Sequence, residues 1–358
     1  MNLNASVTTT TDIDPAATNG CIVPTRLPDT IHPAVEYVQA SIVFITMILA
    51  LLMNGFVVIL IARNKVLHKM AFFLALQLIV AHLVYSVTVL PFVFVTAVLR
   101  EWRLGLVMCQ LLGSIHDTVI TSRYLLTLVL TIDRVISVFY PFFHLRHGGK
   151  VSICNSFIAW VLSLTRSITS LEGVLSCTKY MPIFKMCSGA PFCSEVCQVH
   201  ILFFSTILAA FGVVIPFLLY LVLFSKAKII RYRFINQMQQ VSPSLPPSNN
   251  VLKPVHSNTC SATTKTDEHN HRATWTFVIL TAVIIGCALP PYILYTVQNN
   301  LPGSSPPALT ILQIIVGRTL VHFLTVADPI VILRNRDIRE LIQRKVTIVR
   351  RFSSTQSL

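Results

Sequence analysis

Several ionisable side chains lie inside long apolar stretches of this chain, among them His82, Arg123, Asp133, Arg134 and Asp328. A charge near hydrocarbon is costly, so such groups usually pair with one another or serve a function. Their residue types support ion pairing between helices rather than covalent chemistry. We expect Asp133 and Arg134 to hold helices in one packing arrangement, as a buried ionic pair at a helix end.

Sequence motifs of catalysis are absent. The chain has no His-Glu-x-x-His, no Gly-rich phosphate loop and no Gly-x-Ser-x-Gly, which carry zinc hydrolysis, phosphate binding and serine nucleophiles. The histidines of residues 269–271, with His256, could bind a metal, but solvated loop histidines more often bind nothing. We therefore expect neither enzyme activity nor a cofactor or resident metal.

Long apolar runs must position the ionisable groups. Hydrophobic residues are 54% of the 358 and charged residues 12%, whereas about a quarter of a soluble domain is charged. About 20 apolar residues in a helix span a bilayer. The sequence therefore predicts an all-α membrane protein with a seven-helix bundle. Its runs are residues 35–62, 70–97, 106–138, 152–174, 198–225, 273–297 and 307–333.

Basic residues are unevenly distributed between the connecting segments. Residues 63–69, 134–150, 226–272 and the tail after 333 hold 20 of the 28 Lys and Arg. The positive-inside rule makes this side cytoplasmic, with the amino terminus outside the cell. The net charge of +14 then faces membrane lipids and cytosolic partners rather than nucleic acid.

Segments outside the apolar runs have their own compositions. Residues 1–34 are polar, lack the apolar core of a signal peptide and are expected to be disordered. Residues 226–272 read as a flexible cytoplasmic loop, either a site of phosphorylation or a plain linker. Residues 334–358 begin with apolar residues at helical spacing between basic ones, which predicts a short amphipathic helix in the headgroup layer.

The outer side holds six of the nine cysteines and one glycosylation sequon. The cysteines are Cys21, Cys109, Cys177, Cys187, Cys193 and Cys197. An even number in an oxidising compartment predicts disulfides. Asn4 begins the sequon Asn-Ala-Ser, which permits glycosylation.

Short motifs occur in order along the runs. Asn54 lies in "MNGFVVILI" in the first run, and "LTIDRVISVFYPF" ends the third. The sixth run contains "CALPPY", with Ala288 and Pro290, and the seventh ends in "DPIVI", with Asp328 and Pro329. By their order and spacing these motifs resemble those of the rhodopsin-like (class A) G-protein-coupled receptors.

The resemblance implies roles for several of these residues. Arg134 would contact the G protein, and Asp133, Asp328, Pro329 and Pro290 would take part in activation. Three side chains that relatives use in activation are replaced here, by Val135, Ala288 and Ile332. A receptor fold that is constitutively quiet therefore stays open as an alternative.

The resemblance also implies a polar hub in mid-membrane. Where relatives surround a sodium ion, this chain has His82, Arg123 and Asp328, near the Asn54 of the first run. Our hypothesis is that the fixed guanidinium of Arg123 pairs with Asp328 in place of the ion, tuned by His82. In the alternative, Arg123 faces a water-filled cavity unpaired.

Six residues occupy stretches that line the ligand cavity in relatives: His116, Asp117, Tyr292, Tyr295, Arg318 and His322. His116 replaces the acid that amine receptors use, which disfavours an amine, although Asp117 is adjacent. Arg318 could hold the carboxylate of a ligand or pair with Asp117.

The resemblance also implies disulfide pairings. Cys109 with Cys187 is the bridge expected in the family. The spacing of Cys177, Cys187 and Cys197 is similar to that of odorant receptors and implies a second bridge, Cys177 with Cys197. The remaining pair would be Cys21 with Cys193. The long third cytoplasmic loop departs from the odorant branch.

The favoured hypothesis is a plasma-membrane receptor that transmits a small-molecule signal, an odorant being one candidate, to a heterotrimeric G protein. An acidic, lipid or peptide ligand is the first alternative. A multi-spanning transporter is the second, although the internal repeats and paired broken spans of many transporters are absent.

Overall fold

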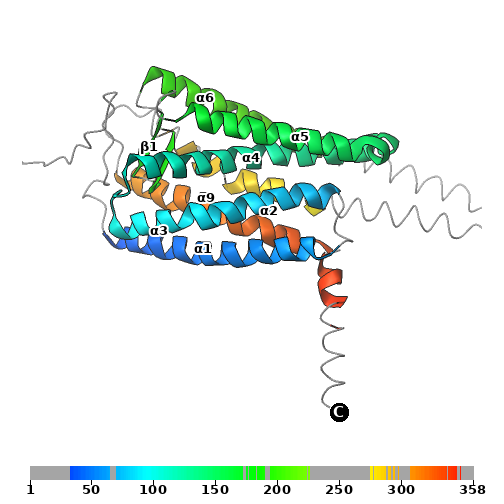
Figure 1. Cartoon of the computed structure of the whole chain (residues 1–358), viewed down its shortest axis with the longest axis horizontal. Coiled ribbons are helices and arrows are strands. Elements are labelled where there is room, and N and C mark those ends of the chain that lie inside the picture. The colour runs from blue at the N-terminus through cyan, green and yellow to red at the C-terminus, as the bar shows by residue number, and fades with distance from the viewer. Residues whose placement is uncertain are drawn as a thin grey trace, which may run out of the picture.

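The computed structural model describes residues 33–64, 70–171, 175, 177–182, 184–189, 194–223, 225, 275–276, 278–287, 289–291, 293–294, 297, 307–336, 338–344 and 347. Over these residues the chain forms a bundle of long helices that run side by side, with a small hairpin at one end (Figure 1). Each predicted apolar run contains helix.

The helices and strands have the following bounds. They are α1 (Pro33–Ala62), α2 (Met70–Thr88), α3 (Leu90–Leu99), α4 (Gly105–Phe139), α5 (Pro141–Thr169), β1 (Thr178–Met181), β2 (Met186–Gly189), α6 (Glu195–Ala209), the π-helical η2 (Ala210–Val214) and α9 (Pro307–Leu333). The sixth run contributes a shorter apolar helix, Val278–Pro291.

Within the described residues, five helical stretches are long and apolar enough to cross a membrane. They are Pro33–Ala62, Phe72–Leu99, Pro141–Thr169, Glu195–Leu223 and Ile311–Leu333. α4 is longer than any of these, but it carries Asp117, Arg123, Asp133 and Arg134 and is correspondingly less apolar. All four of these charged residues are buried, so they face the inside of the bundle rather than lipid.

Two of the differences from the predicted runs occur at prolines. α5 begins at Pro141 rather than at 152, so part of the predicted cytoplasmic connection is helical. Proline suits a first helical turn, where its missing N–H has no partner to lose, and hydropathy detects only the part of a helix within hydrocarbon. The second run is divided between α2 and α3 at Val89, two residues before Pro91, because proline cannot donate a helical hydrogen bond.

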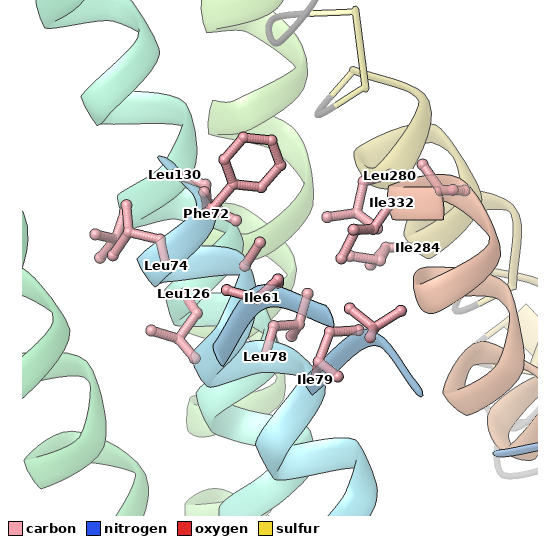
Figure 2. Packing of buried hydrophobic residues seen from close by; sticks show 14 of the residues in the cluster. Ile61, Phe72, Leu74, Leu78, Ile79, Leu126, Leu130, Leu280, Ile284 and Ile332 are labelled. Carbon is pink, nitrogen blue, oxygen red and sulfur yellow. The ribbon is translucent and has the colours of Figure 1, made fainter. Parts of the chain in front are cut away.

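Apolar side chains from several helices form the core at the end of the bundle away from the hairpin. Figure 2 shows Ile61 of α1 and Leu78 of α2 packing beside Leu126 of α4, with Ile284 of the sixth run and Ile332 of α9 facing them. Large apolar residues on the outer faces of the helices stay exposed, as lipid contact requires. After α9, residues 336 and 338–344 form a short helix. Its Ile338 is fully buried against this same core.

The hairpin of β1 and β2 covers one end of α4. The strands pair antiparallel, with Thr178 opposite Gly189 and Met181 opposite Met186. The predicted disulfides are both present: Cys109–Cys187 ties α4 to β2, and Cys177–Cys197 ties the hairpin to α6. The expected partners Cys21 and Cys193 lie outside the described residues, as does Asn4. The two bridges were expected from the resemblance, whereas the strands that they hold were not.

Candidate functional site

A cavity of about 230 Å³ lies between the hairpin and the helices. Its apolar lining residues are Met181, Phe184, Met186, Ile201, Pro291 and Val321. His116 of α4 and Ser188 of β2 add hydrogen-bonding groups. A mostly apolar cavity with a few placed polar groups is typical of a site for a small molecule.

Three of the predicted ligand residues lie at or just behind this lining. His116 lines the cavity itself. Asp117 is buried, and its Oδ1 accepts a hydrogen bond from Ser188 Oγ at 3.1 Å. His322 is buried on α9. Tyr292 and Tyr295 lie outside the described residues.

Arg318 bonds to an acid, Glu36, that was not one of the two alternatives drawn from the sequence. It is buried, its Nη1 lies 3.4 Å from Glu36 Oε2 of α1, and its Nη2 donates to the Pro182 carbonyl at 3.0 Å. A pair with Asp117, one of the two alternatives for Arg318, does not occur among the ion pairs of the described residues. The start of α1 approaches α9 at this level, so a nearer acid is available, and Arg318 braces the hairpin instead of lining the cavity.

Lys185 completes this cluster from the turn of the hairpin. Its Nζ is 3.4 Å from the same Glu36 oxygen and donates to the Arg100 carbonyl at 3.0 Å. Burial lowers the pKa of Lys185 from 10.5 to about 8, and the charge of Glu36 partly offsets this. Neither Lys185 nor Glu36 was singled out from the sequence. The available signal was an acid, Glu36, in the first turn of an apolar run.

Tyr85 of α2 joins two of the predicted residues. Its hydroxyl lies 3.3 Å from Nδ1 of His116 and 3.4 Å from Nδ1 of His322, so three helices meet at one oxygen. All three side chains are buried or nearly so. Tyr85 was also missed, because a tyrosine in an apolar run gives no signal of its own.

The four residues of the expected polar hub are all buried, but they do not form the expected bond. Asn54 Nδ2 donates to the carbonyls of Ala50 and Thr325, at 2.7 and 2.8 Å. His82 Nε2 is 3.5 Å from Asp328 Oδ2. Neither carboxylate oxygen of Asp328 accepts a hydrogen bond from a described residue.

The hypothesis of a direct bidentate bond between Arg123 and Asp328 is therefore wrong for this structure. The guanidinium carbon of Arg123 lies 5.4 Å from the ring centroid of Tyr124, its neighbour on α4. Contact with an aromatic face is a favourable environment for a guanidinium. Arg123 thus finds a partner on its own helix, and its interaction with Asp328 acts through space.

The Asp133–Arg134 pair lies near the other end of α4 and is buried. Arg134 donates to Asp133 Oδ2 from Nη2 and from Nε, the latter at 3.0 Å. The other oxygen, Oδ1, accepts from Ser152 Oγ at 2.9 Å and lies 3.1 Å from His144 Nε2. Ser152 and His144 belong to α5, so the acid is fixed from two helices. Neither was singled out in the sequence.

The predicted prolines lie in helices. Pro329 is inside α9 next to Asp328, where it removes one backbone hydrogen bond. Pro290 is helical in the sixth run, and its neighbour Ala288 lies outside the described residues. Val135 and Ile332, which replace side chains used by relatives, pack in the apolar core.

Fold and site together define a multi-pass membrane receptor. A family model, the 7 transmembrane receptor (rhodopsin family), matches residues 53–331. The chain belongs to this family, which consists of signalling receptors and not of enzymes. The rhodopsin-like resemblance expected from the motifs is thereby confirmed, and so is the seven-helix bundle.

Individual relatives agree with this assignment. The chain is 24% identical to the mouse (Mus musculus) alpha-1A adrenergic receptor over 287 residues, 73% of this chain and 57% of that receptor. It is 31% identical to the rat (Rattus norvegicus) alpha-1A adrenergic receptor over 131 residues, 35% of this chain and 27% of the relative. These matches span less than two thirds of the relatives' length. The crystal structure of squid rhodopsin matches 92% of both chains with a TM-score of 0.69 and 16% identity.

Proposed function

We propose that this protein is a receptor that passes the signal of a small extracellular molecule to a heterotrimeric G protein. The observation that carries the proposal is the arrangement along α4. His116 lines a cavity near one end of this helix, and the Asp133–Arg134 pair lies near the other. Seventeen residues of helix separate them, or about 25 Å.

The Asp133–Arg134 pair is a set of contacts whose making or breaking a bound ligand could favour. Asp133 holds Arg134 within the bundle while α5 holds Asp133. Binding in the cavity would favour a packing of the helices in which this set of contacts is broken and Arg134 is free to meet a cytosolic transducer. The positive-inside asymmetry supports a cytoplasmic location for this end.

The cavity favours a neutral, largely apolar ligand. The described residues that line it include no acid, lysine or arginine. Arg318, the best candidate for binding a ligand carboxylate, is already bonded to Glu36. An acidic ligand therefore loses support relative to a small neutral one. An odorant is one such neutral ligand. The Cys177–Cys197 bridge supports it, because this is the second bridge implied by the odorant-like cysteine spacing.

The test is a ligand screen with matched arginine variants. Cells that express the chain would be exposed to neutral odorants, carboxylic acids, amines and lipids, with reporters for several G-protein classes. We expect a response to a neutral molecule that Arg134→Ala abolishes at equal surface expression. Arg146→Ala, at an exposed position on α5, should keep it. Ligand-dependent uptake or current without any reporter response would instead favour a transporter.

A further inference from the structure

The hydroxyl of Tyr85 lies between two histidine nitrogens, Nδ1 of His116 at 3.3 Å and Nδ1 of His322 at 3.4 Å. The three side chains come from α2, α4 and α9, and His322 and Tyr85 are each 1% exposed. One end of this chain of hydrogen bonds, His116, lines the cavity. The other end, His322, is enclosed by the bundle.

A single tyrosine hydroxyl can donate only one proton, so it donates to one histidine and accepts from the other. Each neutral imidazole carries its proton on one nitrogen, and which nitrogen is set by the hydrogen bond that the other makes. The three groups therefore have two possible polarities. In one, Tyr85 donates toward His116, and in the other it donates toward His322.

The buried end decides between them. Nε2 of His322 is buried and has no hydrogen-bond partner among the described residues. If Tyr85 donated to His322 Nδ1, the proton of His322 would sit on Nε2 as a buried N–H without an acceptor. Among buried backbone groups, orphaned N–H donors are rarer than under-satisfied C=O acceptors. We apply the same preference to the imidazole of His322. A protonated His322 would have the same orphan N–H and an added buried charge.

The favoured polarity therefore places the proton of His322 on Nδ1, from which it donates to the Tyr85 oxygen. Tyr85 in turn donates to Nδ1 of His116. The proton of His116 then resides on Nε2, the ring nitrogen that is not bonded to Tyr85 and is available to a ligand in the cavity. The other polar lining residue, Ser188, gives its proton to Asp117 and so presents oxygen lone pairs.

We propose that Tyr85 and His322 fix His116 as a hydrogen-bond donor in the cavity, so that the site selects a small neutral molecule carrying an acceptor oxygen, such as a ketone, aldehyde or ester. The inference rests on the proposed function only in taking the cavity as the ligand site. His116 is the specificity-determining residue, and Tyr85 and His322 are positioning residues.

The proton positions can be measured without a ligand or a G protein. Purified receptor with ¹⁵N-labelled histidine, reconstituted in nanodiscs, would be studied by NMR, with His116→Gln and His322→Gln used to assign the signals. We expect a protonated Nε2 in His116 and a protonated Nδ1 in His322. A protonated Nε2 in His322 would overturn the proposal, whatever the receptor does in signalling assays.

A second experiment tests the consequence for ligands. Aryl and cyclic ketones would each be compared with the isostere in which C=CH2 replaces C=O, such as acetophenone with α-methylstyrene. The affinity of each compound would be obtained from the concentration that raises the unfolding temperature of the purified receptor. One neutral hydrogen bond corresponds to an affinity about tenfold higher for the ketone. His116→Gln, whose amide can donate, should keep that preference, and His116→Leu should abolish it.

The conservative variant Tyr85→Phe keeps the aromatic ring and removes the hydroxyl that connects His116 with His322. It should reduce the ketone preference while the variant still folds, as judged by its surface expression. Equal affinity for both members of each pair in the unmodified receptor, or a ketone preference unchanged in His116→Leu, would contradict the inference.

Discussion

At the scale of single residues, both carboxylate oxygens of Asp133 have identified partners. Its Oδ2 accepts hydrogen bonds from Arg134. Its Oδ1 accepts one from Ser152 Oγ at 2.9 Å and lies 3.1 Å from His144 Nε2. Hydrogen bonds to a charged group are stronger than neutral ones, because the charge polarises the donor. The contacts from α5 should therefore help to keep Arg134 inside the bundle.

Ser152→Ala should raise signalling in the absence of agonist. A hydrogen bond to a charged group contributes about 1.5 to 3 kcal/mol, so its loss would shift the balance between packings by about tenfold or more. The measurement is basal reporter activity at matched surface expression. Ser163→Ala is the control, because Ser163 is a buried serine of α5 whose hydroxyl donates to the Ala159 carbonyl of the same helix. Unchanged basal activity in Ser152→Ala would show that α5 does not restrain the pair.

Asp328→Asn should reduce the amount of folded receptor, although Asp328 makes no direct bond with Arg123. Removing the acid takes away the attraction that the buried guanidinium of Arg123 feels through space. Because the two groups are not in direct contact, the loss should be smaller than the roughly 3 to 5 kcal/mol of a broken buried pair. Surface expression and unfolding temperature would report the loss. The double variant Arg123→Met with Asp328→Asn should recover much of it. A double variant less stable than either single variant would contradict this coupling.

At the scale of elements, the hairpin is the part whose placement makes the cavity. Disulfides tie it to α4 and α6, and Glu36 of α1 meets Lys185 in its turn. It also approaches α4 closely at Gly113, where an added Cβ would lie 2.5 Å from Thr178 Cγ2 and 3.3 Å from the Cys187 carbonyl oxygen. Glycine at this position lets the hairpin lie on the helix.

Gly113→Ala should move the hairpin away from α4, lower the unfolding temperature and weaken ligand responses. Overpacking of this kind costs about 1 to 3 kcal/mol. Gly55→Ala in α1 is the matched change, since nothing lies within 4 Å of the added Cβ there. It should be neutral or stabilise by about 0.5 to 1 kcal/mol. Equal effects of the two substitutions would argue against the close approach.

The buried amine of Lys185 predicts a pH dependence of stability. Its pKa falls from 10.5 to about 8 in the folded protein. Between pH 8 and 10.5 the unfolded chain therefore binds more protons at this site, so the free energy of unfolding gains a contribution that rises with pH. The unfolding temperature of the purified receptor, measured from pH 7.5 to 10, should show this rise. Lys185→Met and Lys185→Arg should both lack it, the first without a charge and the second with a permanent one.

At the scale of the whole molecule, the two functional regions lie at opposite ends of the bundle. The hairpin lies at one end, and the short helix after α9 leaves the other (Figure 1). Residues of the hairpin line the cavity, so the cavity lies at the hairpin end. A ligand outside the cell and a transducer inside it would thus reach different ends of α4. This separation requires the hairpin to be extracellular.

Epitope tags at the two termini test that orientation. In intact cells an antibody should reach a tag at the amino terminus and not one at the carboxyl terminus, which should become accessible only after permeabilisation. The basic segments between the runs are expected on the cytoplasmic side. Accessibility of both tags in intact cells would disprove the topology on which the proposed function depends.

The sequence by itself determined the apolar runs and, through its motifs, the family. The resemblance to that family in turn implied the two disulfides. These properties can be read along the chain: the length of each apolar run, the adjacent Asp133 and Arg134, and the positions of Cys109 and Cys187. Even the departures at Val135 and Ile332 were visible there.

Only the tertiary structure decided which side chains meet. Glu36 and Arg318 are 282 residues apart, and their contact depends on how α1 and α9 are rotated about their axes. The same holds for Tyr85 between two histidines, and for Arg123, which lies over Tyr124 instead of bonding to Asp328. Hydropathy predicts that a segment is a helix in a membrane. The partner of a buried charge is decided by distances between helices, and these are set by the packing of the whole bundle.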